Sequence, residues 1–238
     1  MRTAVPLPIP IPVEISDRDV DGLIIKTAKG ASLTGVVVLE GSNDRALLGK
    51  LYQLRLNAWV QGGPSGLPAW RSTSISPDGS FRLAGLPTGV ANINTLSSSD
   101  HRPVKDFVVL HSEREGIRVT QGIELKAGSE TTGLRVLVAH GNGVVRGELI
   151  FVNGPTPGSR LVAQLTRAGE SVPLRHAEVD ARGHFAVEGM PAGTYWLQVY
   201  GNLPAARNMV PTQVNVVDGA VTEVTITLDL NPKSDSRP

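Results

Sequence analysis

The stretch DGSFRLAGLPTGV, residues 78–90, returns later in the chain as ARGHFAVEGMPAGT, residues 181–194. Both copies contain a glycine, a phenylalanine, a second apolar residue two positions later, and a Gly-apolar-Pro-x-Gly ending. Phe81 and Leu83 are two apart, so they lie on one face of a strand. Proline presets φ and glycine allows positive φ, so the ending reverses the chain. The repeat predicts a turn, a short strand and a second turn in each copy.

The rest of the two copies also matches, and the main length difference is an insertion in the first. This insertion, SNDRALLGKLYQL at residues 42–54, has Ser42 or Asn43 as a cap for one or two helical turns. No sustained helical period occurs elsewhere, which predicts two all-β sandwiches in tandem. The further matching segments are 33–41 with 144–154 and 55–60 with 160–165.

The composition agrees with many short strands joined by tight turns. The chain of 238 residues contains 26 Gly and 17 Pro, yet 40% of it is apolar, which is enough to fold. The 23 basic and 22 acidic residues are scattered, so no nucleic-acid-binding surface is expected. No apolar run is long enough to span a membrane. The absence of cysteine excludes disulfides, thiol catalysis and thiolate metal sites.

At the repeated motif the sequence resembles the carboxypeptidase regulatory-like domain, a prealbumin-like (transthyretin-like) β-sandwich of seven strands. The resemblance covers residues 32–139 and 143–230. The second copy, which contains AGTYWLQVYG, fits the family better than the first, which has Val90-Ala91 in place of Thr-Tyr. The resemblance implies non-catalytic modules, often in tandem, of bacterial surface or periplasmic proteins.

These observations predict an all-β chain of two tandem seven-stranded prealbumin-like sandwiches preceded by an extra strand segment. The predicted parts are an N-terminal strand segment at 1–30, sandwiches at 31–140 and 141–232, and a tail at 233–238. The N-terminal apolar run is broken by prolines and no small-residue cleavage site follows it, so we do not interpret it as a signal peptide.

The N-terminal segment alternates proline with large apolar residues in VPLPIPIPVEI, residues 5–15. Its prolines remove every backbone donor along one edge, so a strand built from it pairs on one side only. Burial of the apolar row would contribute on the order of 10 kcal/mol before ordering costs. We therefore assign the row to an assembly strand. Its members are Val5, Leu7, Ile9, Ile11, Val13 and Ile15.

Residues 12–27 also resemble the closing strands of each sandwich, because Gly22-Leu23 matches Gly133-Leu134. The first residues thus look like the end of a module whose body is missing. Three interpretations remain open. The segment is a solvated polyproline-type linker left from a longer array, it docks within its own chain, or it adds to the sheet of a neighbouring subunit.

Chemical motifs are weak. The sequence DRDVDG imitates the start of a calcium loop through Asp17, Asp19 and Asp21, but its twelfth position is Ala28 instead of an acid. An aspartate-rich turn is the favoured interpretation. The five histidines lie apart in sequence, and no hydrolase or phosphate-binding motif is present. We therefore expect no enzyme and no cofactor.

The best binding candidates are aromatic. If Leu56, Ala58 and Val60 face inward, Trp59 faces outward, and Trp70 on the next strand lies beside it. This pair predicts either a sugar- or peptide-binding platform or a packing surface between modules. A second outward pair is formed by Trp196 and Tyr200.

The expected function is a non-enzymatic structural or assembly module of the cell envelope or exterior. Its partners would be further copies or neighbouring modules, joined by N-terminal strand addition into a filament or array. The alternative is a carbohydrate- or peptide-binding accessory module of a larger surface protein.

Overall fold

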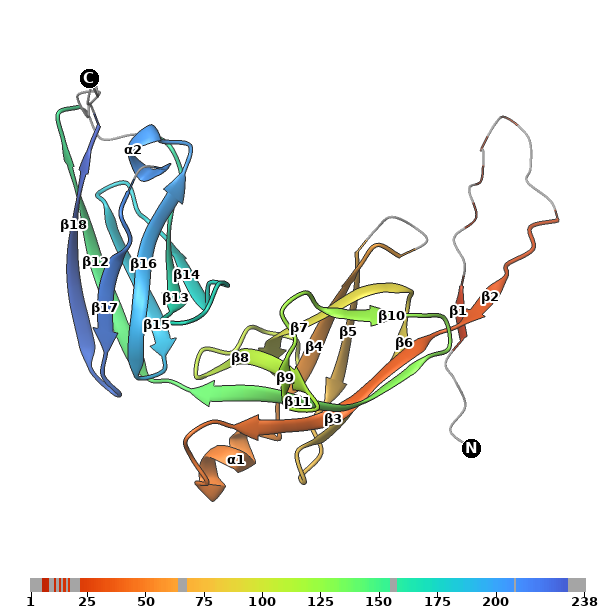
Figure 1. Ribbon diagram of the computed structural model, residues 1–238. Coiled ribbons are helices and arrows are strands. Elements are labelled where there is room, and N and C mark those ends of the chain that lie inside the picture. The colour runs from red at the N-terminus through yellow and green to blue at the C-terminus, as the bar shows by residue number, and fades with distance from the viewer. Residues whose placement is uncertain are drawn as a thin grey trace. The chain divides into compact units, whose positions relative to one another are not determined.

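The computed structural model describes residues 6–8, 11, 13, 15, 17, 22–63, 68–154, 158–207 and 209–230. The protein is all-β, as the sequence predicts: 58% of the described residues lie in strands and 4% in helices (Figure 1). The chain forms two compact units. Unit 1 comprises Met1–Val104 with Val108–Ala139, and unit 2 comprises Lys105–Phe107 with His140–Pro238.

Unit 1 contains sandwich 1, which is built from two sheets. Four strands lie in the order β10-β7-β4-β5, and five lie in the order β6-β3-β11-β8-β9. The closing strand β11 pairs in parallel with the opening strand β3. The strands are β3 (Ala31–Leu39), β4 (Arg55–Gln61), β5 (Ala69–Ser74), β6 (Ser80–Leu86), β7 (Gly89–Ser97), β8 (Phe107–Arg114), β9 (Ile117–Arg118), β10 (Ile123–Leu125) and β11 (Glu130–His140).

Unit 2 contains sandwich 2, whose sheets have the orders β15-β12-β18 and β14-β13-β16-β17. Its closing strand β18 again pairs in parallel with its opening strand β12. Strand by strand, this order repeats that of sandwich 1 without β8 and β9. The strands are β12 (Gly143–Val152), β13 (Leu161–Arg167), β14 (Arg175–Glu178), β15 (His184–Met190), β16 (Gly193–Gly201), β17 (Thr212–Val216) and β18 (Val221–Asp229).

The strand count differs from the prediction in sandwich 1. Its described residues form nine strands, two more than the predicted seven, because β8 and β9 lie between β7 and β10. At the same point of sandwich 2 the chain forms a single helical turn, α2 (Pro204–Arg207), which buries Ala205 and Ala206. The repeat predicts neither element, since neither has a counterpart in the other copy.

The predicted helical insertion is present as α1 (Arg45–Leu51). Its cap is Asp44 and not Ser42 or Asn43, because an oxygen of the Asp44 side chain accepts from the Ala46 N–H at 2.7 Å. Ser42 instead accepts a hydrogen bond from the Asp44 N–H at 3.2 Å. Leu51 at the end of α1 is fully buried and anchors the helix to the sandwich.

The repeated motif has the same local structure in both sandwiches. Gly85 and Gly189 have φ of +68° and +69°, a region that an L side chain adopts only with strain. The motif phenylalanines are buried, and each lies opposite a strand glycine: Phe81 opposite Gly35 and Phe185 opposite Gly147. A Cβ built at Gly147 would overlap the Phe185 ring. Gly147 therefore leaves room for the Phe185 ring, whereas a Cβ at Gly35 would overlap the backbone of Leu134 on the neighbouring strand.

Tyr195 stands where sandwich 1 has Ala91. It is fully buried, and its hydroxyl donates a hydrogen bond to the Pro191 carbonyl at 2.8 Å. The bond ties the start of β16 to the turn before it, so the polar end of the ring is satisfied inside the core.

Candidate interaction sites

The N-terminal residues form an arm with a two-stranded sheet of its own. We call residues 6–29 the N-terminal arm. In it β1 (Pro6–Pro8) pairs antiparallel with β2 (Thr27–Lys29), and Leu7 lies opposite Ala28. Only Gly30 separates β2 from the opening strand of sandwich 1 (Figure 1). Val5 and Ile9 of the predicted assembly strand lie outside the described residues.

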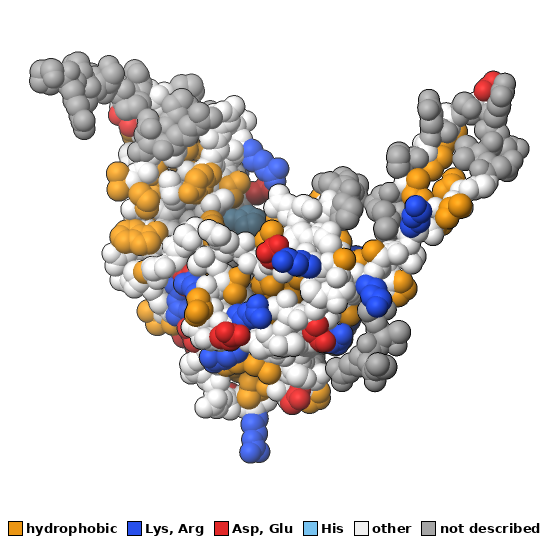
Figure 2. All heavy atoms as spheres, turned by 45° about the vertical axis from the view of Figure 1, so that its right-hand side comes forward, with side chains coloured by type: hydrophobic (Ala, Val, Ile, Leu, Met, Phe, Trp, Pro, Cys, Tyr) orange, Lys and Arg blue, Asp and Glu red, His pale blue; other side chains and the backbone are white. Residues whose placement is uncertain are grey.

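The described apolar residues of the arm are largely in contact with solvent. Leu7 is half-buried, whereas six other large aliphatic side chains are exposed. Figure 2 shows hydrophobic side chains along the arm. These residues are not buried against sandwich 1. The six are Ile11, Val13, Ile15, Leu23, Ile24 and Ile25.

The weak calcium candidate falls in the same arm. Asp17 is exposed, and Asp19 and Asp21 lie outside the described residues. Within the part of the chain that the structure describes, no group of three or more His, Asp or Glu side chains could hold a metal ion.

The second candidate is the outer face of the four-stranded sheet of sandwich 1. Leu56, Ala58 and Val60 are fully buried, and Trp59 points to the opposite face. Trp59 and Trp70 are cross-strand partners whose ring centroids lie 5.8 Å apart with 12° between the planes. The side of Trp70 that does not contact Trp59 remains available, because the residue is 58% exposed. The indole Nε1 of Trp59 is buried without a hydrogen-bond partner among the described residues.

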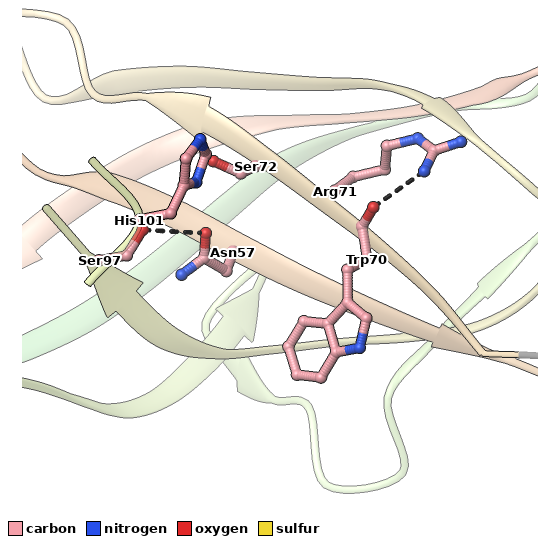
Figure 3. Close-up of a pocket in the computed structure, with 6 residues that line it drawn as sticks. All are labelled: Asn57, Trp70, Arg71, Ser72, Ser97 and His101. Atoms are coloured by element: carbon pink, nitrogen blue, oxygen red, sulfur yellow. Dashed lines mark hydrogen bonds between the residues drawn. The ribbon is translucent and has the colours of Figure 1, made fainter. Parts of the chain in front are cut away.

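A cavity of about 380 Å³ lies beside Trp70. Figure 3 shows His101, Asn57, Ser97 and Ser72 gathered on one side of it. His101 is at the tip of a tight loop and has φ of 64°, which directs the backbone back toward the sheet. No sequence pattern predicts the position of this residue, because the loop has no counterpart in sandwich 2. The cavity is lined by Asn57, Trp70, Arg71, Ser72, Ser97 and His101.

Both arginines that flank the tryptophans are used by the fold. The Arg55 Nε donates to the Ser72 hydroxyl at 2.6 Å, and the Arg71 Nε donates to the Gly85 carbonyl at 2.9 Å. Arg71 points away from the side-chain cluster (Figure 3). The groups that face the cavity are therefore mainly an amide, hydroxyls, an imidazole and an indole, which suit a neutral polar ligand better than an ionic one.

The second aromatic pair belongs to sandwich 2. Trp196 and Tyr200 are both exposed on the outer face of β16. The Tyr200 hydroxyl donates to the Gln198 side chain at 2.9 Å, so this face is a mixed polar and aromatic strip.

An acidic hollow of about 580 Å³ lies on the other sheet of sandwich 2. In it His184 lies 3.7 Å from Asp180 and 3.8 Å from Glu148, although the sequence places the three residues on different turns and strands. All three side chains are more than half exposed, so these contacts are weak in water.

Asp180 has a structural role in this hollow. Its side chain accepts from the His184 N–H at 2.8 Å and from the Arg182 N–H at 2.9 Å, which closes the turn before β15. Chiefly the bond from the His184 N–H lowers the pKa of Asp180. A lowered folded-state pKa means that the stabilisation is present above the ordinary aspartate pKa of about 3.9 and is lost as the pH falls through the folded value.

We therefore expect the free energy of unfolding of the Asp180→Asn variant to fall less steeply with decreasing pH than that of the wild type. Below about pH 4 the wild type loses free energy of unfolding as Asp180 takes up a proton, and the variant has no such group. Urea unfolding of both proteins between neutral and acidic pH measures this slope. Identical slopes would show that the turn does not depend on the charge.

Comparison with known proteins does not define a family. No family model matches the chain, and no curated protein matches it. Among solved structures, it is similar to GBS52, a minor pilin of Streptococcus agalactiae, at 14% identity and TM-score 0.37 over 87% of this chain and 99% of that one. It is also similar to the shaft pilin SpaA of Lactobacillus rhamnosus GG, at 11% identity and TM-score 0.30 over 88% and 100% of the respective chains. Similarity at this level does not transfer a function. Among the described residues, no helix has the length and apolar character needed to cross a membrane.

Proposed function

We propose that this chain is a non-enzymatic structural module that joins a neighbouring module through its N-terminal arm by strand addition. The observation that carries the proposal is the row of exposed aliphatic side chains in the arm. Contiguous apolar surface of this kind marks an interaction site when it occurs on a folded protein. Neighbours of this type would build an array or filament in the cell envelope or exterior, a location implied by the family resemblance.

The prolines allow the joining strand to pair along only one of its edges. A proline has no N–H, so the alternating prolines leave one edge of the segment without donors, while the residues between them keep theirs. Such a strand completes one sheet and does not template a further strand on its other side. The partner is a second copy or a neighbouring module. Neither nucleic acid nor a membrane is required.

Removal of residues 1–15 tests the proposal. We expect the full chain to self-associate with increasing concentration, because the exposed apolar side chains of the arm can pack on those of another copy. We expect the shortened chain to remain monomeric in sedimentation velocity. The melting of the two sandwiches should be nearly the same in both proteins, since the exposed arm residues make few contacts with them. Equal association of the two proteins at every concentration would reject the proposal.

The cavity beside Trp70 supports a second candidate function, binding of a neutral carbohydrate or a peptide. An exposed indole face next to amide and hydroxyl groups can stack on an apolar face of a ligand and hydrogen-bond its edge. We expect a panel of neutral oligosaccharides and peptides to include one that shifts the tryptophan fluorescence of the wild type and not of Trp70→Ala. No shift with any member would assign the two tryptophans to packing between modules.

A further inference from the structure

We infer that the N-terminal arm is a set of closing strands, and that its partner is a sandwich of this same fold that lacks its own closing strands. This inference rests on the proposed function and names the partner. The partner would supply the counterparts of β3 to β7, and the arm would supply the counterparts of β8, β10 and β11.

One backbone feature of the arm matches β11. Gly22 and Gly133 both have left-handed φ, +71° and +74°, and each is followed by leucine. At Gly133 the positive φ accompanies the register shift that lets β11 continue alongside β3. The same local device thus occurs in both places.

The connection to the following sandwich is also the same. In the middle of the chain β11 ends at His140 and β12 begins at Gly143 after two residues. At the start, β2 ends at Lys29 and β3 begins at Ala31 after one residue. In both places a closing-type strand runs almost directly into an opening strand.

The pairing within the arm matches the pairing beside β11. In sandwich 1, β8 is the neighbour of β11 on the side away from β3. In the arm, β1 is the neighbour of β2, which continues the segment that begins at Gly22. β1 therefore has the place of β8, and its prolines leave the outer edge without donors, as expected for the last strand of a sheet.

Burial separates the arm from its counterparts in sandwich 1. Leu23 is 49% exposed, whereas Leu134 is 1% exposed. Ile25 is 68% exposed, whereas Val136 is fully buried.

Val13 and Ile15 differ from their counterparts in the same way. Val13 and Ile15 are exposed, and their counterparts Ile123 and Leu125 in β10 are buried. The arm thus exposes apolar side chains whose counterparts in sandwich 1 are buried in the core. The interior of a sandwich of this fold would bury them.

The register of β11 fixes how the partner must pair. β11 runs parallel to β3, with Val136 opposite Val37 and Arg135 opposite Val36. Ile25 should therefore lie opposite the partner's counterpart of Val37 and face inward, and Ile24 should face outward. Sandwiches 1 and 2 already contain β11 and β18 beside their opening strands, so a second complete copy offers no such vacancy.

The test supplies the missing strands. A second copy of residues 31–104, which contains β3 to β7, is fused ahead of residue 5 of the full chain. The chain contains no cysteine. Ile24→Cys in the arm and Val36→Cys in the added segment therefore give one defined pair of cysteines. We expect this pair to form a disulfide on oxidation, since facing Cα atoms of paired strands lie within disulfide range. The control is Ile24→Cys in the arm with Val38→Cys in the added segment, and this pair should form no disulfide.

Further outcomes decide between partners. We expect the fusion not to self-associate and to show a third cooperative unfolding step. Ile25→Asp in the fusion should reverse both changes, whereas Ile24→Asp should not alter them. If the fusion forms no specific disulfide and still self-associates through the arm, the inference is wrong and the proposed function stands. If the unfused chain with Ile24→Cys and Val36→Cys forms that disulfide between two copies, the partner is a second complete copy and the inference is again wrong. If removal of residues 1–15 changes nothing, the proposed function itself fails.

Discussion

Leu134→Asp should unfold sandwich 1, whereas Leu23→Asp should leave the melting of both sandwiches unchanged. The two leucines follow matching glycines, but Leu134 is buried in the core and Leu23 is exposed. A carboxylate at Leu134 loses the leucine contacts and leaves an unpaired charge in an apolar interior, at a cost of about 4 kcal/mol or more. An exposed substitution changes stability by about 0.5 kcal/mol or less.

Chemical denaturation monitored by tryptophan fluorescence measures both variants. Trp59 and Trp70 report on sandwich 1 and Trp196 reports on sandwich 2, so the loss of one sandwich is resolved from the other. A large destabilisation by Leu23→Asp would mean that the arm packs on its own chain. That result would contradict the exposure of the arm.

Gly147→Val should destabilise sandwich 2 by roughly 2–4 kcal/mol. Gly147 lies opposite Phe185 in the sheet, and a Cβ there would overlap the buried aromatic ring. The ring cannot move outward without exposing its apolar surface, so the strand or the core must shift. Thermal unfolding of sandwich 2 gives the change directly.

Two further variants isolate the cause. Gly158→Val is the matched control, because no atom lies within 4 Å of a Cβ built at Gly158. In a Phe185→Ala background, Gly147→Val should cost less than in the wild type, since the two sites share one space. Equal costs in both backgrounds would show that the ring is not the obstacle.

Much of the fold could be predicted from the repeat, because the repeated residues are those that the turns and the core require. Glycines such as Gly85 and Gly189 are needed for positive φ, and Phe81 and Phe185 fill the core. The repeat could not predict the elements that only one of the two copies contains. The strands β8 and β9 and the single turn α2 are alternative ways to fill the same connection, and neither has a twin to reveal it.

The candidate sites were predictable only where strand alternation fixes the side of a residue. Alternation along β4 predicts that Trp59 faces away from Leu56 and Val60, and the structure has that arrangement. The approach of His101 to the Trp70 cavity depends on a tight loop with a left-handed residue, which no periodicity encodes. Likewise, the proline alternation predicts a one-sided strand, but only the coordinates show that Ile15 and Ile25 are left exposed.

Amide hydrogen exchange at residues 23–26 tests most directly whether the arm is a closing strand that lacks its partner. In the isolated chain at low concentration, these amides should exchange nearly unprotected, while residues 134–137 of β11 exchange slowly. In the fusion with the added strands, residues 23–26 should approach the slow exchange of residues 134–137. Strong protection in the isolated chain, or none in the fusion, would contradict the closing-strand assignment.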